Sequence, residues 1–398
     1  MKLVHGGDWA GYRAEFGRDA LDFSANVSPL GLPHGVAAAI SAALPTADRY
    51  PDPLCRELRA ALAAAEGVPI EHILCGSGAA GGIRVSRPWA PGHHSGGYGL
   101  QALGSSEYAA ALDMVGCTVE RFLLDEANDF AVTEDFVQAV TEETDMVFLC
   151  QPNNPTGQVT PPTLVERLVS RCADCGAVLV VDECFLDFLP DRDALTAERF
   201  LNDAPKLVIL KAFTKLYAMA GVRLGYALCS DTALLAGMQA AGQPWAVSGL
   251  AQAAGLAALQ ESAYAEAVRA LIEAERPYLL AGLRALGLRV IEGRANYLLF
   301  RADETLGERL EARGALIRRC GNYPGLDDTW YRTAVRTRRE NDALLAALRS
   351  AGQGAKPIDV IYRSAVRSNQ VKWHHLHAMP VPVAAGAAPT LFGIITDV

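Results

Sequence analysis

Residues 177–183 read AVLVVDE, a short apolar run rich in β-branched side chains that ends in two carboxylates. Such a run is typical of a strand buried on both faces of a parallel sheet. The preceding segment, VERLVSRCADCG (165–176), has the periodicity of an amphipathic helix and ends in glycine. Similar strand-like runs are MVFLCQPNN (146–154) and KLVILKAF (206–213). Strands alternating with helices predict an α/β protein with a mainly parallel sheet and right-handed crossovers.

The pattern changes after about residue 240. A long helical stretch (251–287) leads to short strand-like runs around RVIEGRANYLLFR, and NDALLAALRSAG (341–352) has the pattern of a closing helix. These elements predict a smaller α+β domain beside the first. The expected organisation is an N-terminal arm packed on the small domain (1–45), a large domain (46–240), a small C-terminal domain (241–352) and an atypical tail (353–398).

Composition excludes several classes of protein. The chain has 398 residues and a net charge of −9, which argues against a nucleic-acid or anionic-membrane surface. No apolar run approaches the ~18 residues needed to span a bilayer. Cys172 and Cys175 form one CxxC, but a zinc site needs a second pair and none exists. Reduced thiols in a cytoplasmic protein are the expectation.

Residues 81–104 and 353–398 do not fit the rest of the chain. The first segment holds seven glycines and no acidic residue, and neither segment keeps a period. Glycine and proline cost about 1 and 3 kcal/mol per helical position, so residues 81–104 predict a poor helix. Five of the eight histidines fall in these segments, but KWHHLH (372–377) lacks the i,i+4 spacing and carboxylates of a metal site, so no metal is expected. The histidines are His93, His94, His374, His375 and His377.

Chemically useful residues follow the predicted strands, where parallel sheets bind ligands. Asp182 ends the strand at 177–183, and QPNNPTGQ (151–158), with its two asparagines, follows another. Lys215 follows KLVIL in apolar company, which should lower its pKa and free its amine. Arg223 stands eight residues later between glycines. Gly76-Ser77-Gly78 follows the short run HILC, and a glycine-rich turn that opens a helix offers N–H groups to an anion.

The order of these features resembles the fold-type I enzymes that use pyridoxal 5′-phosphate (PLP), in the histidinol-phosphate aminotransferase-like subgroup. Within it the chain is most similar to the decarboxylases that act on L-threonine O-3-phosphate in cobalamin synthesis. The similarity covers roughly residues 3–350 without 81–104. The motifs that carry it are HGG (5–7), LDFSANVSPLGLP (21–33), RYPDP (49–53), FLCQPNNPTG (148–157), VDECFLDF (181–188), TKLYAMAGVRLGY (214–226), QPWAVSGLA (243–251), GRANYLLFR (293–301) and IRRCGNYPGLDDTWYRTAVR (317–336).

The resemblance implies a cofactor site. Lys215 would hold PLP covalently and then move protons, and Asp182 would face the pyridine nitrogen and keep it protonated. Tyr50 would reach the cofactor phosphate of a second subunit, which requires a homodimer with shared sites. Phe185 stands where aminotransferases of the subgroup usually have tyrosine, although ordinary core packing also explains a phenylalanine. The remaining cofactor-binding residues implied are Gly78, Ala79, Tyr108, Asn154, Thr214 and Arg223.

The resemblance also implies a substrate site with two cations. Arg332 would bind the α-carboxylate, and Arg318 with His5 would bind the substrate phosphate, because arginine suits bidentate recognition of both anions. Asn26 and Asn154 would line the same pocket. Without the resemblance, a solvated face would be the favoured interpretation of these arginines and Arg336. The implied reaction releases carbon dioxide and yields (R)-1-amino-2-propanol O-2-phosphate.

Two other functions stay open. A histidinol-phosphate-type aminotransferase uses the same cofactor motifs, because only the orientation of the substrate separates the reactions. An impaired relative is the second alternative: Ala212 replaces a serine that usually contacts the cofactor phosphate, and Ser105 replaces an aromatic that usually stacks on its ring. The abrupt break at 81–104 is typical of compensating frameshifts, and the tail could arise by read-through.

Overall fold

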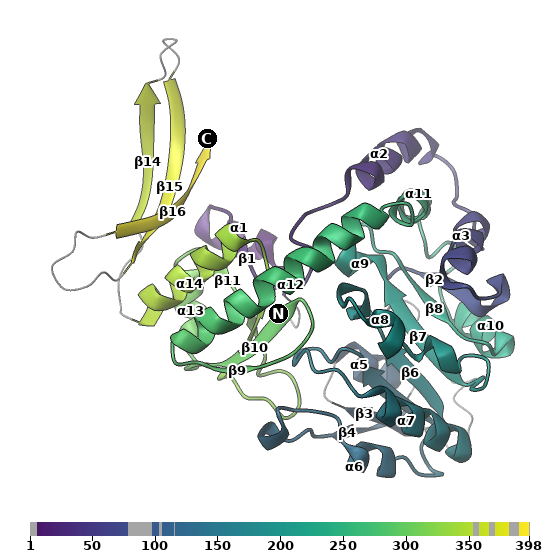
Figure 1. The fold of residues 1–398 in the computed structure, drawn as a ribbon. Helices are drawn as coiled ribbons and strands as arrows, with labels where there is room; N and C mark the ends of the chain where they lie inside the picture. Colours follow the sequence, from purple (N-terminus) through teal and green to yellow (C-terminus); the bar gives the residue numbers. More distant parts are fainter. Residues whose placement is uncertain are drawn as a thin grey trace.

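The computed structural model describes residues 6–78, 98–102, 106–114, 116–352, 358–365, 371–381 and 390–397. A large α/β part and a smaller α+β part lie side by side, and the long helix α12 (Ser262–Ala285) runs along both (Figure 1). The predictions for His5, Ala79 and Ser105 concern positions outside the described residues.

The large part is built on a mixed sheet of seven strands in the order β2-β8-β7-β6-β5-β3-β4. All pairs from β7 to β4 are parallel, whereas β8 runs antiparallel to both of its neighbours. The prediction of a mainly parallel sheet is therefore confirmed, with β8 as the exception. The strands are β2 (Ile73–Gly76), β3 (Tyr98–Ala102), β4 (Thr118–Phe122), β5 (Met146–Cys150), β6 (Val178–Asp182), β7 (Leu207–Ala212) and β8 (Gly225–Leu228).

Three central strands carry the core. Every residue of β5 and β7 is buried, as is β6 except for its final Asp182. Helix α7 (Pro162–Cys175) covers this sheet with an apolar face and ends at Gly176, whose φ of 72° is left-handed. The predicted strands and the predicted helix before AVLVVDE are confirmed. Their apolar runs fit strands in the middle of a sheet that is covered on both faces.

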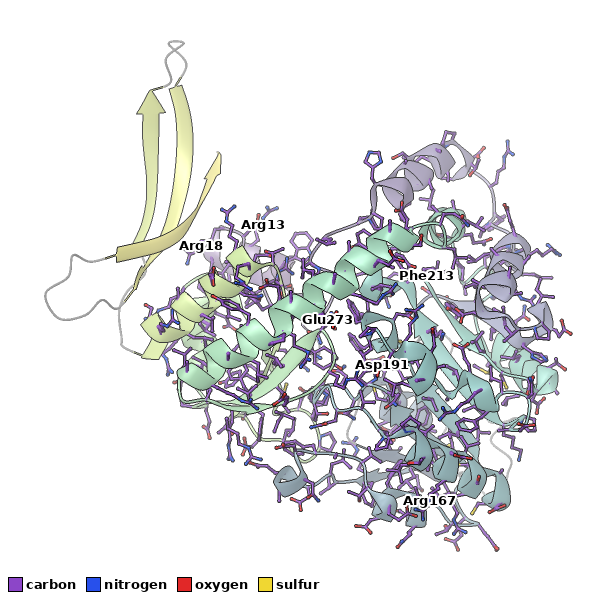
Figure 2. All side chains as sticks on the ribbon, in the orientation of Figure 1. Arg13, Arg18, Arg167, Asp191, Phe213 and Glu273 are labelled. Carbon is purple, nitrogen blue, oxygen red and sulfur yellow. The ribbon has the colours of Figure 1, made fainter. Side chains whose placement is uncertain are left out.

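Helices cover the sheet on its two faces (Figure 1), and side chains fill the space between the layers (Figure 2). Helix α9 (Phe213–Leu216) directly continues β7 and carries Lys215. The other helices of this part are α3 (Arg56–Glu66), α5 (Ser106–Met114), α6 (Glu134–Gln138), α8 (Arg192–Leu195) and α10 (Thr232–Ala241). Among the described residues, no helix combines the length and the apolar character that a membrane crossing requires.

The smaller part is an antiparallel sheet in the order β12-β13-β10-β9, packed on helices α12, α13 and α14. Its core includes Tyr297, Leu298 and Phe300 from β10 and Leu344 from α14. The elements are β9 (Arg289–Ile291), β10 (Tyr297–Arg301), β12 (Arg318–Arg319), β13 (Trp330–Ala334), α13 (Leu306–Glu311) and α14 (Arg338–Gly352).

The long helix expected over residues 251–287 is two helices. Helix α11 (Gly249–Ala258) ends with tight turns at Gln260 and Glu261, whose N–H groups bond to Ala257 and Ala258 oxygens at 3.0 Å each. The Glu261 carboxylate then accepts from the Gly35 N–H at 3.0 Å, at the start of α2 (His34–Ala43). This tertiary contact lies at the break between the two helices.

The N-terminal segment lies against the smaller part (Figure 1). Strand β1 (Leu21–Asp22) pairs in parallel with β11 (Ala315–Leu316), and the Phe23 carbonyl accepts from the Ala334 N–H at 2.8 Å. Helix α1 (Trp9–Phe16) adds a hydrogen bond from Tyr12 to the Glu311 carbonyl at 2.9 Å. The residues after β1 are thereby carried from the smaller part toward the large sheet.

Two segments that looked irregular contain strands. Residues 98–102 form β3, which pairs in parallel with both β4 and β5, so the aperiodic stretch 81–104 does supply a sheet strand. The tail contains an antiparallel sheet of β14 (Ile358–Ala365), β15 (Val371–Val381) and β16 (Thr390–Asp397). The tail strands contain several β-branched and aromatic residues, a local preference that a search for helical periods does not detect.

Candidate active site

The carboxyl ends of β5, β6 and β7 bring Asn154, Asp182 and Lys215 to one edge of the sheet. These neighbouring strands are parallel, so the residues that follow them must meet there. The Lys215 ammonium lies 5.2 Å from the centre of the Phe185 ring, which comes from the loop after β6. Three of the residues predicted from the sequence thus converge from three separate segments.

Lys215 is held in place by a backbone hydrogen bond, and the pKa of its side chain is lowered. Its carbonyl accepts from the Ser28 N–H at 2.9 Å, and Thr214 beside it is buried. Burial lowers the pKa of Lys215, and the cations Arg332 and Arg223 lower it further against the opposing effect of Asp182. A lysine with a lowered pKa is neutral more often near pH 7, which a nucleophilic or proton-transferring amine requires.

Asp182 is held through both oxygens. Its Oδ1 accepts from the Cys184 N–H at 3.0 Å, and its Oδ2 accepts from the Tyr108 hydroxyl. Its own carbonyl accepts from the Gln151 N–H at 2.8 Å, which ties the end of β6 to the loop after β5. The carboxylate therefore has a fixed orientation at the strand edge.

Arg332 connects the smaller sheet to this edge. Its side chain is buried in β13 and donates to the Ser24 carbonyl at 2.9 Å and to the Asn154 side chain. With its amide oriented to accept, Asn26 lies 3.1 Å from Arg332 Nε and 3.3 Å from Nη1. The guanidinium also lies 5.4 Å from the Tyr297 ring centre. Residues from the N-terminal arm and from both parts meet around this one cation.

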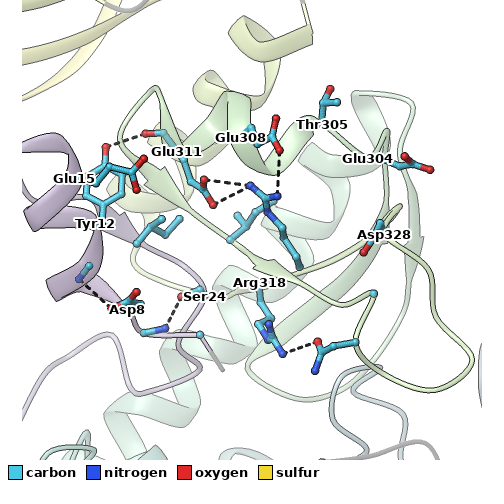
Figure 3. A pocket seen from close by; sticks show the side chains of 18 of the residues that line it. Asp8, Tyr12, Glu15, Ser24, Glu304, Thr305, Glu308, Glu311, Arg318 and Asp328 are labelled. Carbon is cyan, nitrogen blue, oxygen red and sulfur yellow. Dashed lines mark hydrogen bonds and ion pairs between the residues drawn. The ribbon is translucent and has the colours of Figure 1, made fainter. Parts of the chain in front are cut away.

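Arg318 is the cross-strand neighbour of Arg332. The two positions pair in register between β12 and β13, and both side chains are buried. Arg318 donates to Asn322 at 2.7 Å and lines a cavity of 750 Å³ between the N-terminal arm and the smaller sheet. Figure 3 shows Arg318 on one side of this cavity and Glu308 and Glu311 on another. The Arg336 guanidinium is instead bound by Glu340 at 2.7 Å and donates to the Asp22 carbonyl at 3.3 Å.

Gly78 and Arg223 form a cradle of the kind that an anion requires. Gly78 has a φ of 84°, which L side chains rarely adopt, and a Cβ built there would lie 2.9 Å from Arg223 Nη2. Arg223 is exposed, with a φ of 62°, and donates to the Ala220 carbonyl at 3.3 Å. A cation beside a glycine turn, a strand-end carboxylate and a lysine amine together match the phosphate, the ring nitrogen and the aldehyde of PLP.

Tyr50 lies apart from this cluster. Its side chain is 80% exposed and packs against Trp245, with ring centres 4.6 Å apart. Single exposed apolar side chains are common on protein surfaces, whereas neighbouring exposed aromatic side chains often mark a contact with another molecule.

Several contributors were not predicted from the sequence. Ser24 and Ser28 act through their backbone, Cys184 through its N–H and Asn322 through its side-chain oxygen. Backbone contacts leave no residue-type signal, so only the motifs that contain these residues could have pointed to them. Among the described residues, no group of three potential metal ligands occurs.

The fold and the site together define a fold-type I enzyme that depends on PLP. The profile of the family "Aminotransferase class I and II" matches residues 18–348, and the chain belongs to this family. It is 40% identical over 350 residues to the threonine-phosphate decarboxylase of Salmonella typhimurium, covering 85% of this chain and 93% of that one.

The chain is also similar to histidinol-phosphate aminotransferases. The histidinol-phosphate aminotransferase of Symbiobacterium thermophilum is 32% identical over 349 residues, which cover 84% of this chain and 92% of that one. The crystal structure of the histidinol-phosphate aminotransferase from Clostridium acetobutylicum superimposes with a TM-score of 0.77 at 26% identity, covering 83% of this chain and 99% of that one.

Proposed function

We propose that this chain decarboxylates L-threonine O-3-phosphate with PLP, releasing carbon dioxide and (R)-1-amino-2-propanol O-2-phosphate. The observation that carries the proposal is the pair of buried arginines, Arg318 and Arg332, at facing positions of neighbouring strands. Two cations close together suit a small substrate with two anionic groups. The 40% identical relative named threonine-phosphate decarboxylase supports the same choice.

The cofactor is assigned to the strand edge. Lys215 would hold it covalently, Asp182 would take its ring nitrogen, and Asn154 would donate to its ring oxygen. The phosphate belongs between the Gly78 turn and Arg223, where a side chain at position 78 would intrude. Bound there, PLP supplies an electron sink for the pair of electrons left on Cα when carbon dioxide departs.

The substrate is assigned to the arginine pair. Arg332 would bind the α-carboxylate from a position fixed by Ser24 and Asn154, while Arg318 and His5 would bind the phosphate. Holding both ends restricts rotation of the substrate about the bond between its nitrogen and Cα. The bond to the carboxylate can thereby be kept perpendicular to the cofactor ring, which makes the carboxylate the departing group. The protonated Lys215 side chain, which its lowered pKa makes a stronger acid, would then deliver a proton to Cα and become the neutral amine.

Aminotransfer is the alternative, supported by the 32% identical histidinol-phosphate aminotransferase. The two reactions differ in whether a 2-oxo acid is consumed. We expect the purified protein with PLP to convert L-threonine O-3-phosphate into 1-amino-2-propanol phosphate without any 2-oxo acid, measured by phosphorus NMR. Strict dependence on a 2-oxo acid would instead support the aminotransferase.

An impaired relative is tested through the cofactor alone. Lysine-bound PLP absorbs visible light, so a functional Lys215 predicts a visible band that the Lys215→Ala variant lacks. No band in the wild-type protein after incubation with PLP would contradict any PLP-dependent activity. The loss of the phosphate contact at Ala212 predicts weaker binding by about 1.5–3 kcal/mol, not its absence.

We further propose a cytoplasmic homodimer. The exposed pair of Tyr50 and Trp245 supports a surface covered by a second subunit. None of the nine cysteines is paired in a disulfide, which supports a reducing compartment.

A further inference from the structure

Tyr108 lies in α5 with its ring enclosed. The side chain is 2% exposed, and its ring stacks on Phe148 of β5 with centres 4.9 Å apart and planes 11° apart. Leu112, Met146 and Val180 belong to the same hydrophobic cluster. A phenol buried in such surroundings needs a partner for its hydroxyl.

That partner is Asp182. The Tyr108 hydroxyl donates to Oδ2, while the Cys184 N–H donates to Oδ1 at 3.0 Å. Burial and the Asp182 carboxylate raise the pKa of Tyr108 well above its usual value, so the hydroxyl keeps its proton and remains a donor. The two carboxylate oxygens are thus held by donors from different segments of the chain.

We infer that Tyr108 is a positioning residue, which fixes the Asp182 carboxylate in the orientation that receives the cofactor ring. Each carboxylate oxygen can accept more than one hydrogen bond, so the bond from Tyr108 leaves Oδ2 able to accept from a ring N–H. Tyrosine brings no charge, so it orients the anion without neutralising it. This inference rests on the proposed function, which assigns the ring nitrogen to Asp182.

The test compares two tyrosine variants. Tyr108→Phe removes only the hydroxyl and keeps the stacking on Phe148. Tyr278→Phe is the matched control, because Tyr278 also donates its hydroxyl to an aspartate, Asp342, on the smaller part. We expect PLP affinity, titrated through its visible absorbance, to fall about tenfold in Tyr108→Phe and to stay unchanged in Tyr278→Phe. Equal affinities in Tyr108→Phe and the wild-type protein would overturn the inference.

A double-mutant cycle separates positioning from a general structural role. If Tyr108 acts through Asp182, Tyr108→Phe should weaken PLP binding much less in an Asp182→Asn background than in the wild type. Additive losses would overturn the inference while leaving the proposed function intact. If Asp182→Asn alone leaves PLP affinity unchanged, the assignment of the ring nitrogen fails, and the inference fails with it.

The kinetic constants give an independent readout. Tyr108 does not contact the arginine pair, so we expect Tyr108→Phe to lower kcat several-fold with little change in KM for L-threonine O-3-phosphate at saturating PLP. A change confined to KM would contradict a role on the cofactor side of the site.

Discussion

At the residue scale, Arg332 is the most constrained side chain of the site. It is buried and shares hydrogen bonds with the N-terminal arm and with the loop after β5. Arg332→Lys keeps the charge but loses the planar fork, so kcat/KM for L-threonine O-3-phosphate should fall about 10²-fold.

Arg336→Lys is the matched control for this prediction, because Glu340 binds the Arg336 guanidinium and the proposed substrate site does not use it. It should keep kcat/KM within a few-fold of the wild type. A loss as large as that of Arg332→Lys would show that positive charge at this end of the smaller sheet matters in general, against a specific carboxylate site.

Gly78 gives a second residue-scale prediction. Gly78→Ala adds a Cβ 2.9 Å from Arg223 Nη2 at a φ of 84°, so we expect about tenfold weaker PLP binding, measured by absorbance titration. Gly17→Ala carries a similar backbone cost, since Gly17 has a φ of 67°, but a Cβ there meets nothing within 4 Å. It should lose stability and keep its PLP affinity; equal losses of affinity in both variants would refute the phosphate cradle.

At the scale of elements, strand β6 is followed directly by Glu183, whose carboxyl group is buried. Glu183 is 1% exposed and accepts from the Ala197 N–H at 2.7 Å and the Thr196 hydroxyl at 2.8 Å. Burial raises the pKa of Glu183 to about 7 from an ordinary value of 4.5, although Lys211 opposes this effect. The folded state therefore holds a proton here that the unfolded chain releases.

This difference predicts a pH dependence of stability. The protonated carboxyl stabilises the fold fully below about pH 4.5, and the contribution falls as pH rises to about 7, by about 3 kcal/mol in all. Glu183→Gln removes the titration. The free energy of unfolding of the wild type relative to Glu183→Gln, from urea denaturation, should decrease between these pH values and level off above them. A constant difference would contradict the assignment.

The same scale shows what the sequence could predict. The sequence could predict strands β5, β6 and β7 and the residues that follow them. A buried parallel strand is an uninterrupted apolar run, and ligands bind at the carboxyl ends of such strands. Strand β3 was not predictable, because Tyr98–Ala102 contains no β-branched residue and is held by pairing with its two neighbours. The contact of Glu261 at the break before α12 is with Gly35, over 200 residues away in sequence, and no local pattern contains it.

The site divides in the same way. Lys215, Asp182 and Asn154 were predictable from their positions after strands, whereas the link between Arg332 and Ser24 joins residues 308 apart. The role of Tyr108 lies between these cases: the family resemblance implied that it binds the cofactor, but only the hydroxyl bond to Asp182 indicates what it does there.

At the scale of the whole molecule, shared active sites make a distinct prediction. If Tyr50 of one subunit completes the site of the other, Lys215→Ala and Tyr50→Ala each impair both sites of their own dimers. After mixing and exchange of subunits, half of the dimers are hybrids with one complete site each, so about a quarter of wild-type activity should return. No recovery, despite subunit exchange seen by native mass spectrometry, would refute shared sites.

The central claim is that carbon dioxide, not an amino group, leaves the substrate. The most direct measurement is the release of labelled carbon dioxide from L-threonine O-3-phosphate carrying label in its carboxyl carbon, with PLP and no 2-oxo acid. We predict one equivalent of labelled carbon dioxide for each 1-amino-2-propanol phosphate formed, and none from Lys215→Ala. Retention of the label in a 2-oxo product, formed only when an amino acceptor is added, would contradict the account.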